Sequence, residues 1–80
     1  MSHVLLVEPD DDLCLFLRLA IGGVGRRVTI AGSRAEANEV LNGSEPVDVA
    51  ITSLVLPDGS GLFLARDALR RAKRTYLLRS

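Results

Sequence analysis

The chain has no tryptophan, one cysteine and one histidine, and aromatic side chains make up only 4% of its 80 residues. Because a single cysteine, Cys14, excludes an intrachain disulfide, we expect a reducing cytoplasm as the compartment. No apolar run approaches the roughly 18 residues that a membrane-spanning helix needs. The apolar run Val4 to Val7 is interrupted at once by acidic residues, so no signal peptide is expected. No membrane partner is expected.

The composition is that of one small soluble globular domain over residues 1–80, with 48% hydrophobic and 25% charged residues. The net charge is zero, but residues 1–60 carry four basic and nine acidic side chains, and residues 61–80 carry six and one. This balance gives no reason to expect a nucleic-acid partner. Four basic side chains near the end of the predicted third helix are interpreted as a solvated face: Arg66, Arg70, Lys73 and Arg74.

Hydrophobic periodicity predicts strands that alternate with helices. The continuous apolar run from Val4 to Val7 is typical of a strand buried on both faces. Further strands are expected at about 27–31, 47–52 and 75–78. Helices are expected after Asp12, from Ser33 to Leu41 with a capping box at its start, and over about 60–73. This alternation across short loops predicts an α/β fold with parallel βαβ units.

Functional sites of open parallel sheets lie at the carboxyl ends of the strands. The first predicted strand is followed there by Glu8, Pro9 and Asp10, and the third by residues 53–59. Asp10 is interpreted, with the two aspartates after it, as the cap of the first helix. His3 is expected at the surface, at the start of the first strand, where it has no serine or cysteine partner.

Two segments resemble bacterial response-regulator receiver domains. Residues 5–13 (LLVEPDDDL) resemble that family's first strand and acidic loop, and residues 54–61 (LVLPDGSG) resemble the loop after its phosphoacceptor. The resemblance implies a flavodoxin-like, receiver-type open parallel sheet with strand order 2-1-3-4 and helices on both faces. It also implies a non-enzymatic role in bacterial signalling, with a histidine kinase or another signalling protein as partner. The chain ends about where the family's fifth strand and fifth helix begin, so a C-terminally short domain is expected.

The family's site residues are incomplete in this sequence. By resemblance, Ser53 takes the position of the phosphoacceptor aspartate, and Glu8 and Pro9 take the positions of two Mg²⁺-binding carboxylates. Val55 would supply the family's backbone carbonyl ligand, and Ser80 would match its hydroxyl donor. Arg79, one place earlier, competes with Ser80 for that position. A serine hydroxyl cannot become an acyl phosphate. We therefore expect a degenerate pocket without catalysis, metal or cofactor, and an interaction module that works without phosphorylation.

Two alternatives stay open for this site. Another carboxylate, Asp10 or Asp58, is an alternative phosphoacceptor. The second alternative is that the chain is a fragment of a longer response regulator.

The first predicted helix carries apolar residues on two sides. A broad stripe is expected to face the core, and it consists of Leu13, Phe16, Leu17, Ala20, Ile21 and Val24. Leu15 and Leu19 lie four residues apart on a different side. We expect these two leucines to form the interface of a symmetric homodimer, with the edge of the fourth strand as a further contact.

Overall fold

Four parallel strands form one sheet in the computed structural model, which describes residues 1–78. The strands are β1 (Ser2–Val7), β2 (Arg26–Ala31), β3 (Val47–Ser53) and β6 (Ala72–Leu78). They lie in the order β2-β1-β3-β6, and Leu5 of β1 pairs with Thr29 and Ala50 of its two neighbours. Since β6 is the fourth long strand, the predicted order and the flavodoxin-like fold are confirmed.

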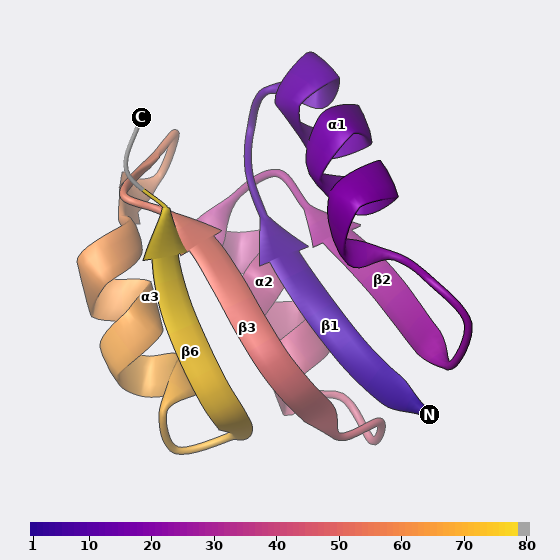
Figure 1. The fold of residues 1–80 in the computed structure, drawn as a ribbon. Coiled ribbons are helices and arrows are strands. Elements are labelled where there is room, and N and C mark those ends of the chain that lie inside the picture. The colour runs from indigo at the N-terminus through magenta and orange to yellow at the C-terminus, as the bar shows by residue number, and fades with distance from the viewer. Residues whose placement is uncertain (79–80) are drawn as a thin grey trace.

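Helices cover the two faces of this sheet unequally. Helix α1 (Asp11–Ile21) lies on one face, over β1 and β2, whereas α2 (Arg34–Asn42) and α3 (Gly61–Ala68) lie on the other (Figure 1). A short hairpin that the sequence did not predict, β4 (Val55–Leu56) with β5 (Gly59–Ser60), connects β3 to α3. Among the described residues no helix is long and apolar enough to span a bilayer.

A polar side chain caps the N-terminus of each helix. Ser33 accepts the Glu36 N–H at 3.2 Å, and Glu36 in turn accepts the Gly32 N–H at 3.2 Å, which is a capping box shifted by one residue from the usual pairing. Ser60 accepts the Leu62 N–H at 3.1 Å at the start of α3. These caps fix where the chain leaves each strand and begins the next helix.

The main core lies between the sheet and the α2/α3 pair. Its buried residues are Leu5, Val7, Ala31, Ala37, Leu41, Val47, Ala50, Leu56, Leu64, Ala68 and Ala72. On the opposite face, α1 buries only Cys14. The expected core stripe of α1 is wrong for Phe16, which is 66% exposed, and for Ala20 and Val24. No helix among the described residues covers β3 and β6 on this face, so α1 has no neighbouring helix there (Figure 1).

The third helix is shorter than predicted. It ends at Ala68, and β6 begins at Ala72 rather than Thr75. The Arg70 and Arg71 N–H groups close the turn on the carbonyls of residues 67 and 68, and buried Ala72 pairs with Val47 of β3. Strand pairing thus overrides the good helix propensity of residues 70–74. Lys73 and Arg74 consequently lie in β6, and the predicted basic face of one helix does not exist.

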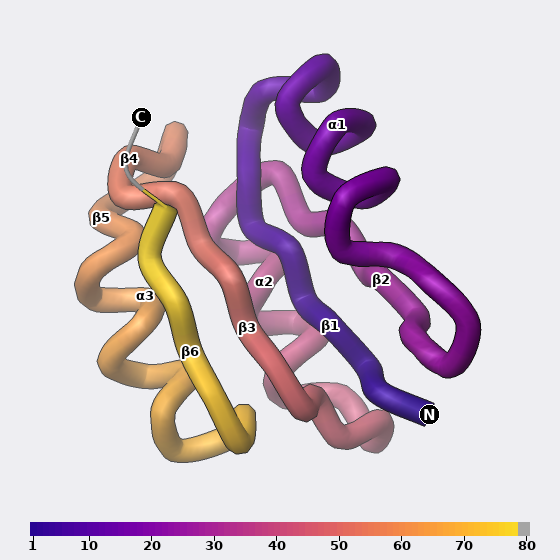
Figure 2. The backbone as a smooth tube through the Cα atoms, in the orientation of Figure 1, coloured from indigo at the N-terminus to yellow at the C-terminus, as the bar shows by residue number. Residues whose placement is uncertain are grey.

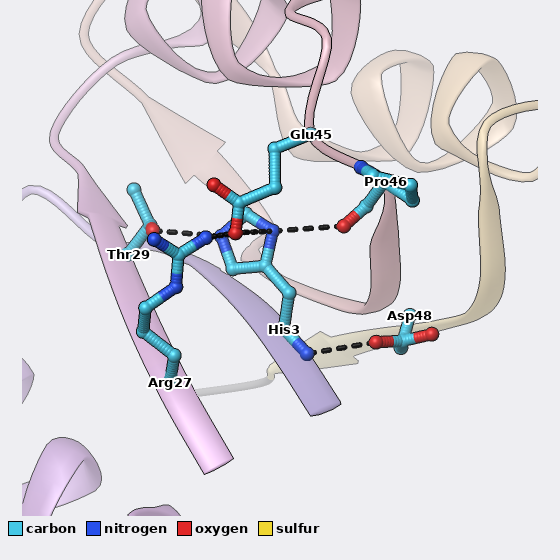
Figure 3. Close-up of polar contacts among 6 residues, drawn as sticks. All are labelled: His3, Arg27, Thr29, Glu45, Pro46 and Asp48. Carbon is cyan, nitrogen blue, oxygen red and sulfur yellow. Dashed lines mark hydrogen bonds and ion pairs between the residues drawn. The ribbon is translucent and has the colours of Figure 1, made fainter. Parts of the chain in front are cut away.

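His3 is buried, which contradicts its predicted place at the surface (Figure 3). Its Nδ1 lies 2.9 Å from the Pro46 carbonyl and its Nε2 lies 2.7 Å from Thr29 Oγ1. Because a carbonyl oxygen only accepts, Nδ1 carries a proton. The His3 backbone N–H also donates to Asp48 at 2.7 Å. This polar cluster ties together β1, β2 and the start of β3 at the amino ends of the strands.

Candidate functional site

The predicted site residues lie at the carboxyl edge of the sheet, where β1, β3 and β6 end side by side (Figure 2). Val7 pairs with Thr52, so Glu8 and Ser53, the next residues, lie at neighbouring positions of adjacent strands. Strands of a sheet are about 4.8 Å apart. Ser53 pairs on its other side with Leu78. The structure therefore brings Glu8 and Ser53 together, whereas Arg79 and Ser80 lie outside the described residues.

Glu8 is buried, with 6% of its surface exposed. Its Oε2 accepts the backbone N–H of Asp10 at 2.9 Å, and its own N–H donates to the Ala31 carbonyl at 3.0 Å. The Cys14 thiol donates to the Glu8 carbonyl at 3.1 Å. One hydrogen bond thus holds the Glu8 carboxylate next to the N-cap of α1, and two more hold its backbone.

Asp10 is the N-cap of α1, as the sequence predicted. Its Oδ1 accepts the N–H groups of Asp12 at 2.9 Å and Leu13 at 3.1 Å. Burial raises the pKa of the Cys14 thiol, and the negative charges of Glu8, Asp11 and Asp10 raise it further. No ion pair within residues 1–78 involves these carboxylates. The loop is therefore acidic, but its first aspartate, Asp10, is engaged by the helix N-terminus.

Ser53 is the half-buried last residue of β3. Its carbonyl accepts the Thr52 hydroxyl at 3.0 Å, and the chain returns so closely that a Cβ at Gly61 would overlap the same carbonyl. The Gly61 N–H closes the loop on the Leu54 carbonyl at 2.8 Å. The only histidine lies at the opposite end of the sheet, so no imidazole activates the Ser53 hydroxyl.

Asp58 has a structural role that the sequence analysis missed. Its two carboxylate oxygens accept the N–H groups of Arg34 at 2.7 Å and Ala35 at 2.9 Å, the first two residues of α2. These two backbone hydrogen bonds, with the nearby Arg34 charge, lower the pKa of Asp58. Because the partners are separated by more than twenty positions, no local pattern predicts this cap.

The residues at the strand ends fit Mg²⁺ poorly. Magnesium requires near-octahedral oxygen coordination, and Glu8 is the one family-position carboxylate that remains. Asp10 caps a helix, and Val55, which would give the carbonyl, is 74% exposed in the β4–β5 hairpin. Within residues 1–78 no three acidic, histidine or cysteine side chains gather around a common point that would hold a metal ion.

Leu15 and Leu19 are 61% and 76% exposed on the β2 side of α1. With Arg18, Gly22 and Val28 they line an open hollow of about 530 Å³. Arg26 and Arg27 also line the hollow, so apolar and basic side chains share it.

Comparisons with known proteins identify relatives of this chain. It is 38% identical over 68 residues to the response regulator receiver protein CpdR of Brucella abortus, covering 85% of this chain and 56% of that protein. It is 32% identical over 74 residues to the response regulator protein PilR of Pseudomonas aeruginosa, covering 92% of this chain and 16% of that protein. The chain therefore spans about half of one curated relative and a small part of the other. No protein-family model matches.

Solved structures agree with the fold. The non-phosphorylated HemR receiver domain from Leptospira biflexa superposes with a TM-score of 0.76 at 30% identity, covering 95% of this chain and 63% of that one. An adenylate cyclase from Rhodopirellula baltica superposes with a TM-score of 0.81 at 24% identity, covering 98% of this chain and 58% of that one. The second likeness concerns the fold alone.

Proposed function

Because this chain belongs to the response-regulator receiver family, we propose that it is a signalling module that binds protein partners without being phosphorylated. One observation carries the proposal: the last residue of β3 is a serine, Ser53, and it follows Thr52, which pairs with the residue before buried Glu8. Acceptance of a phosphoryl group as an acyl phosphate needs a carboxylate at that position. A hydroxyl with no neighbouring base is a weak nucleophile.

The alternative acceptors are less suited to the reaction. One carboxylate oxygen of Asp10 accepts two N–H groups of α1, and both oxygens of Asp58 accept N–H groups of α2. Phosphorylation of either aspartate would disturb a helix cap. The position of Pro9 also lacks the carboxylate that would complete a metal pair with Glu8. These contacts favour a receiver-like fold in which no residue of the pocket accepts a phosphoryl group.

The proposed partners are proteins of bacterial signalling in the cytoplasm, such as a histidine kinase, rather than nucleic acid or membrane. The proposal assigns no enzymatic step and no cofactor to the chain. The zero net charge gives no electrostatic reason to prefer nucleic acid over protein partners.

A second copy of the chain is one such partner. The Leu15–Leu19 side of α1 exposes two large apolar side chains next to a hollow. On a two-fold axis four leucines would meet, and burying each contributes about 1.5 to 3 kcal/mol. That is an appreciable part of the roughly 8 kcal/mol of a micromolar association.

A magnesium titration tests the proposed loss of chemistry. Amide NMR spectra of the wild type should not change around residues 8–10 and 53–55 as Mg²⁺ is added to millimolar levels. The Pro9→Asp/Ser53→Asp double variant should gain saturable shifts there, and Ser53→Asp alone should gain few. Saturable wild-type shifts at Glu8 and Ser53 would contradict the proposal.

A further inference from the structure

The loop after Ser53 is attached to the body of the fold at three points. Leu56, in β4, is 5% exposed and belongs to the main core. The Gly61 N–H closes the loop on the Leu54 carbonyl at 2.8 Å. The third attachment is at the tip of the β4–β5 hairpin, where Asp58 contacts the start of α2. The loop is therefore held at its tip as well as at its base.

The tip of the hairpin approaches α2 closely. Leu56 pairs with Gly59, so Pro57 and Asp58 form the turn between them. Gly59 has a φ of 154°, a backbone conformation that residues with a side chain rarely adopt. A Cβ at this position would also lie 3.3 Å from two atoms of the Arg34 side chain. Glycine therefore permits both the turn and the close approach of Arg34.

The contact between Asp58 and α2 joins an ionised group to two backbone donors. Its carboxylate oxygens accept the N–H groups of Arg34 at 2.7 Å and Ala35 at 2.9 Å. These hydrogen bonds lower the pKa of Asp58, so the carboxylate is ionised at neutral pH. Hydrogen bonds to an ionised group are roughly twice as strong as those between neutral groups. The N-cap residue, Ser33, accepts the N–H of Glu36 instead. Asp58 thus supplies a cap that the local sequence does not.

Arg34 connects this contact to a second helix. Its guanidinium lies 3.8 Å from the Asp67 carboxylate on α3, and α3 begins directly after the hairpin. The hairpin, α2 and α3 are therefore joined to one another. All of these partners lie between residues 33 and 67, and none of the contacts uses the side chain of Ser53 or Glu8. They require neither a group bound at the candidate pocket nor residues outside this range.

We propose that the two hydrogen bonds of Asp58 are a latch, which holds the loop after Ser53 in one conformation without phosphorylation. The surface around the candidate pocket is then presented to protein partners in a constant shape. This inference rests on the proposed function, and it specifies how a module that is not phosphorylated keeps its binding surface fixed. Loss of the latch should release the loop and the first turn of α2 together, because each holds the other.

The test is amide hydrogen exchange, measured by NMR on the 80-residue chain without Mg²⁺ or a phosphoryl donor. The readouts are the N–H of Gly61 in the loop and those of Arg34 and Ala35 in α2. The amide of Leu6, in the inner strand β1, is the reference for global unfolding. Relative to it, all three amides should exchange about tenfold faster or more in Asp58→Ala. Relaxation dispersion should detect exchange broadening of residues 54–60 in this variant and none in the wild type.

Three further variants locate the effect. Arg34→Ala keeps the backbone N–H that Asp58 accepts, so it should accelerate Gly61 exchange less than Asp58→Ala does. Asp12→Asn, an exposed change in the first turn of α1, is the matched control and should leave Gly61 unchanged. Asp58→Asn keeps one acceptor oxygen and should give a smaller acceleration of the same amides, which preserves the comparison if Asp58→Ala does not fold.

Faster exchange in α2 alone, with Gly61 unchanged, would show an ordinary helix cap and overturn the latch. Exchange broadening of residues 54–60 in the wild type would overturn it as well. Neither result concerns the acceptor reaction at Ser53, because no phosphoryl donor is present. Phosphorylation of the wild type would instead contradict the proposed function and would leave these exchange results as they are.

Discussion

Asp58, in the loop of the β4–β5 hairpin, accepts the backbone N–H of Arg34 at 2.7 Å and so joins the loop after the candidate pocket to the start of α2. Its second oxygen accepts the next N–H, that of Ala35. The first two N–H groups of a helix have no partner within the helix. The residue that the sequence analysis held as an alternative phosphoacceptor is therefore a cap supplied from another part of the chain.

Removal of this cap should destabilise the fold. Asp58→Ala should lower the melting temperature measured by circular dichroism, because two N–H groups of α2 lose their acceptor. Glu39→Gln, an exposed change on the same helix, is the control and should leave the melting temperature nearly unchanged. An Asp58→Ala protein as stable as the wild type would show that the cap contributes nothing.

Asp58 should also make stability depend on acidic pH. The lowered pKa means that the folded state holds the ionised carboxylate more strongly than the unfolded state, whose pKa is about 3.9. Its contribution is fully present above that value and is lost as the pH falls through the lower folded value. In urea denaturation, Asp58→Asn should therefore lose less stability than the wild type between neutral pH and about pH 3. Equal losses would contradict this assignment.

Gly61 should be irreplaceable, because its α-carbon lies against the carbonyl of Ser53. Gly61→Ala should cost about 1 to 3 kcal/mol or more in unfolding free energy, since the overlapping atoms belong to the backbone. Gly23→Ala is the matched control, because a Cβ there meets nothing within 4 Å. Similar losses for the two variants, measured by chemical denaturation, would show that the loop adjusts freely.

The proposed dimer predicts a specific loss of association. Sedimentation equilibrium at roughly 50 µM should show dimers of the wild type and monomers of the Leu15→Glu/Leu19→Glu variant. Val24→Glu changes a fully exposed apolar residue outside this surface and should remain dimeric. A well-folded monomeric wild type would remove the basis for the interface.

The buried histidine gives a prediction about the opposite end of the sheet. His3→Ala should cost about 1 to 3 kcal/mol in unfolding free energy, because the Pro46 carbonyl and the Thr29 hydroxyl lose their buried partner. Ser2→Ala, at an exposed neighbour, should cost little. An equally small loss for both variants in chemical denaturation would show that the polar cluster does not stabilise the fold.

The sequence predicted the features that local patterns determine. The apolar run of β1 and the caps at Asp10 and Ser33 follow from periodicity and cap residues, and the parallel βαβ units follow from the alternation of strands and helices. The strand order came from the resemblance to receiver domains. The end of α3 was not predictable in this way, because residues 70–74 favour a helix locally and only pairing of Ala72 with Val47 makes them a strand.

Contacts between distant residues account for the other errors. His3 has partners on β2 and before β3, and Asp58 caps a helix more than twenty residues earlier. Neither set of contacts can be predicted from the residues next to His3 or Asp58 in the sequence. At the candidate site, the register of β1 and β3 places Glu8 beside Ser53, whereas Ser80 lies outside the described residues.

Incubation of the chain with acetyl phosphate and Mg²⁺, followed by intact mass spectrometry, shows whether Ser53 has replaced the phosphoacceptor without any other residue taking over its reaction. The wild type and Ser53→Ala should both show no adduct, because neither has a carboxylate at the end of β3. Ser53→Asp should gain little, since Pro9 still lacks the carboxylate that would bind a metal ion next to Glu8. A wild-type gain of one phosphoryl group that hydroxylamine removes would show an acyl phosphate and contradict the account.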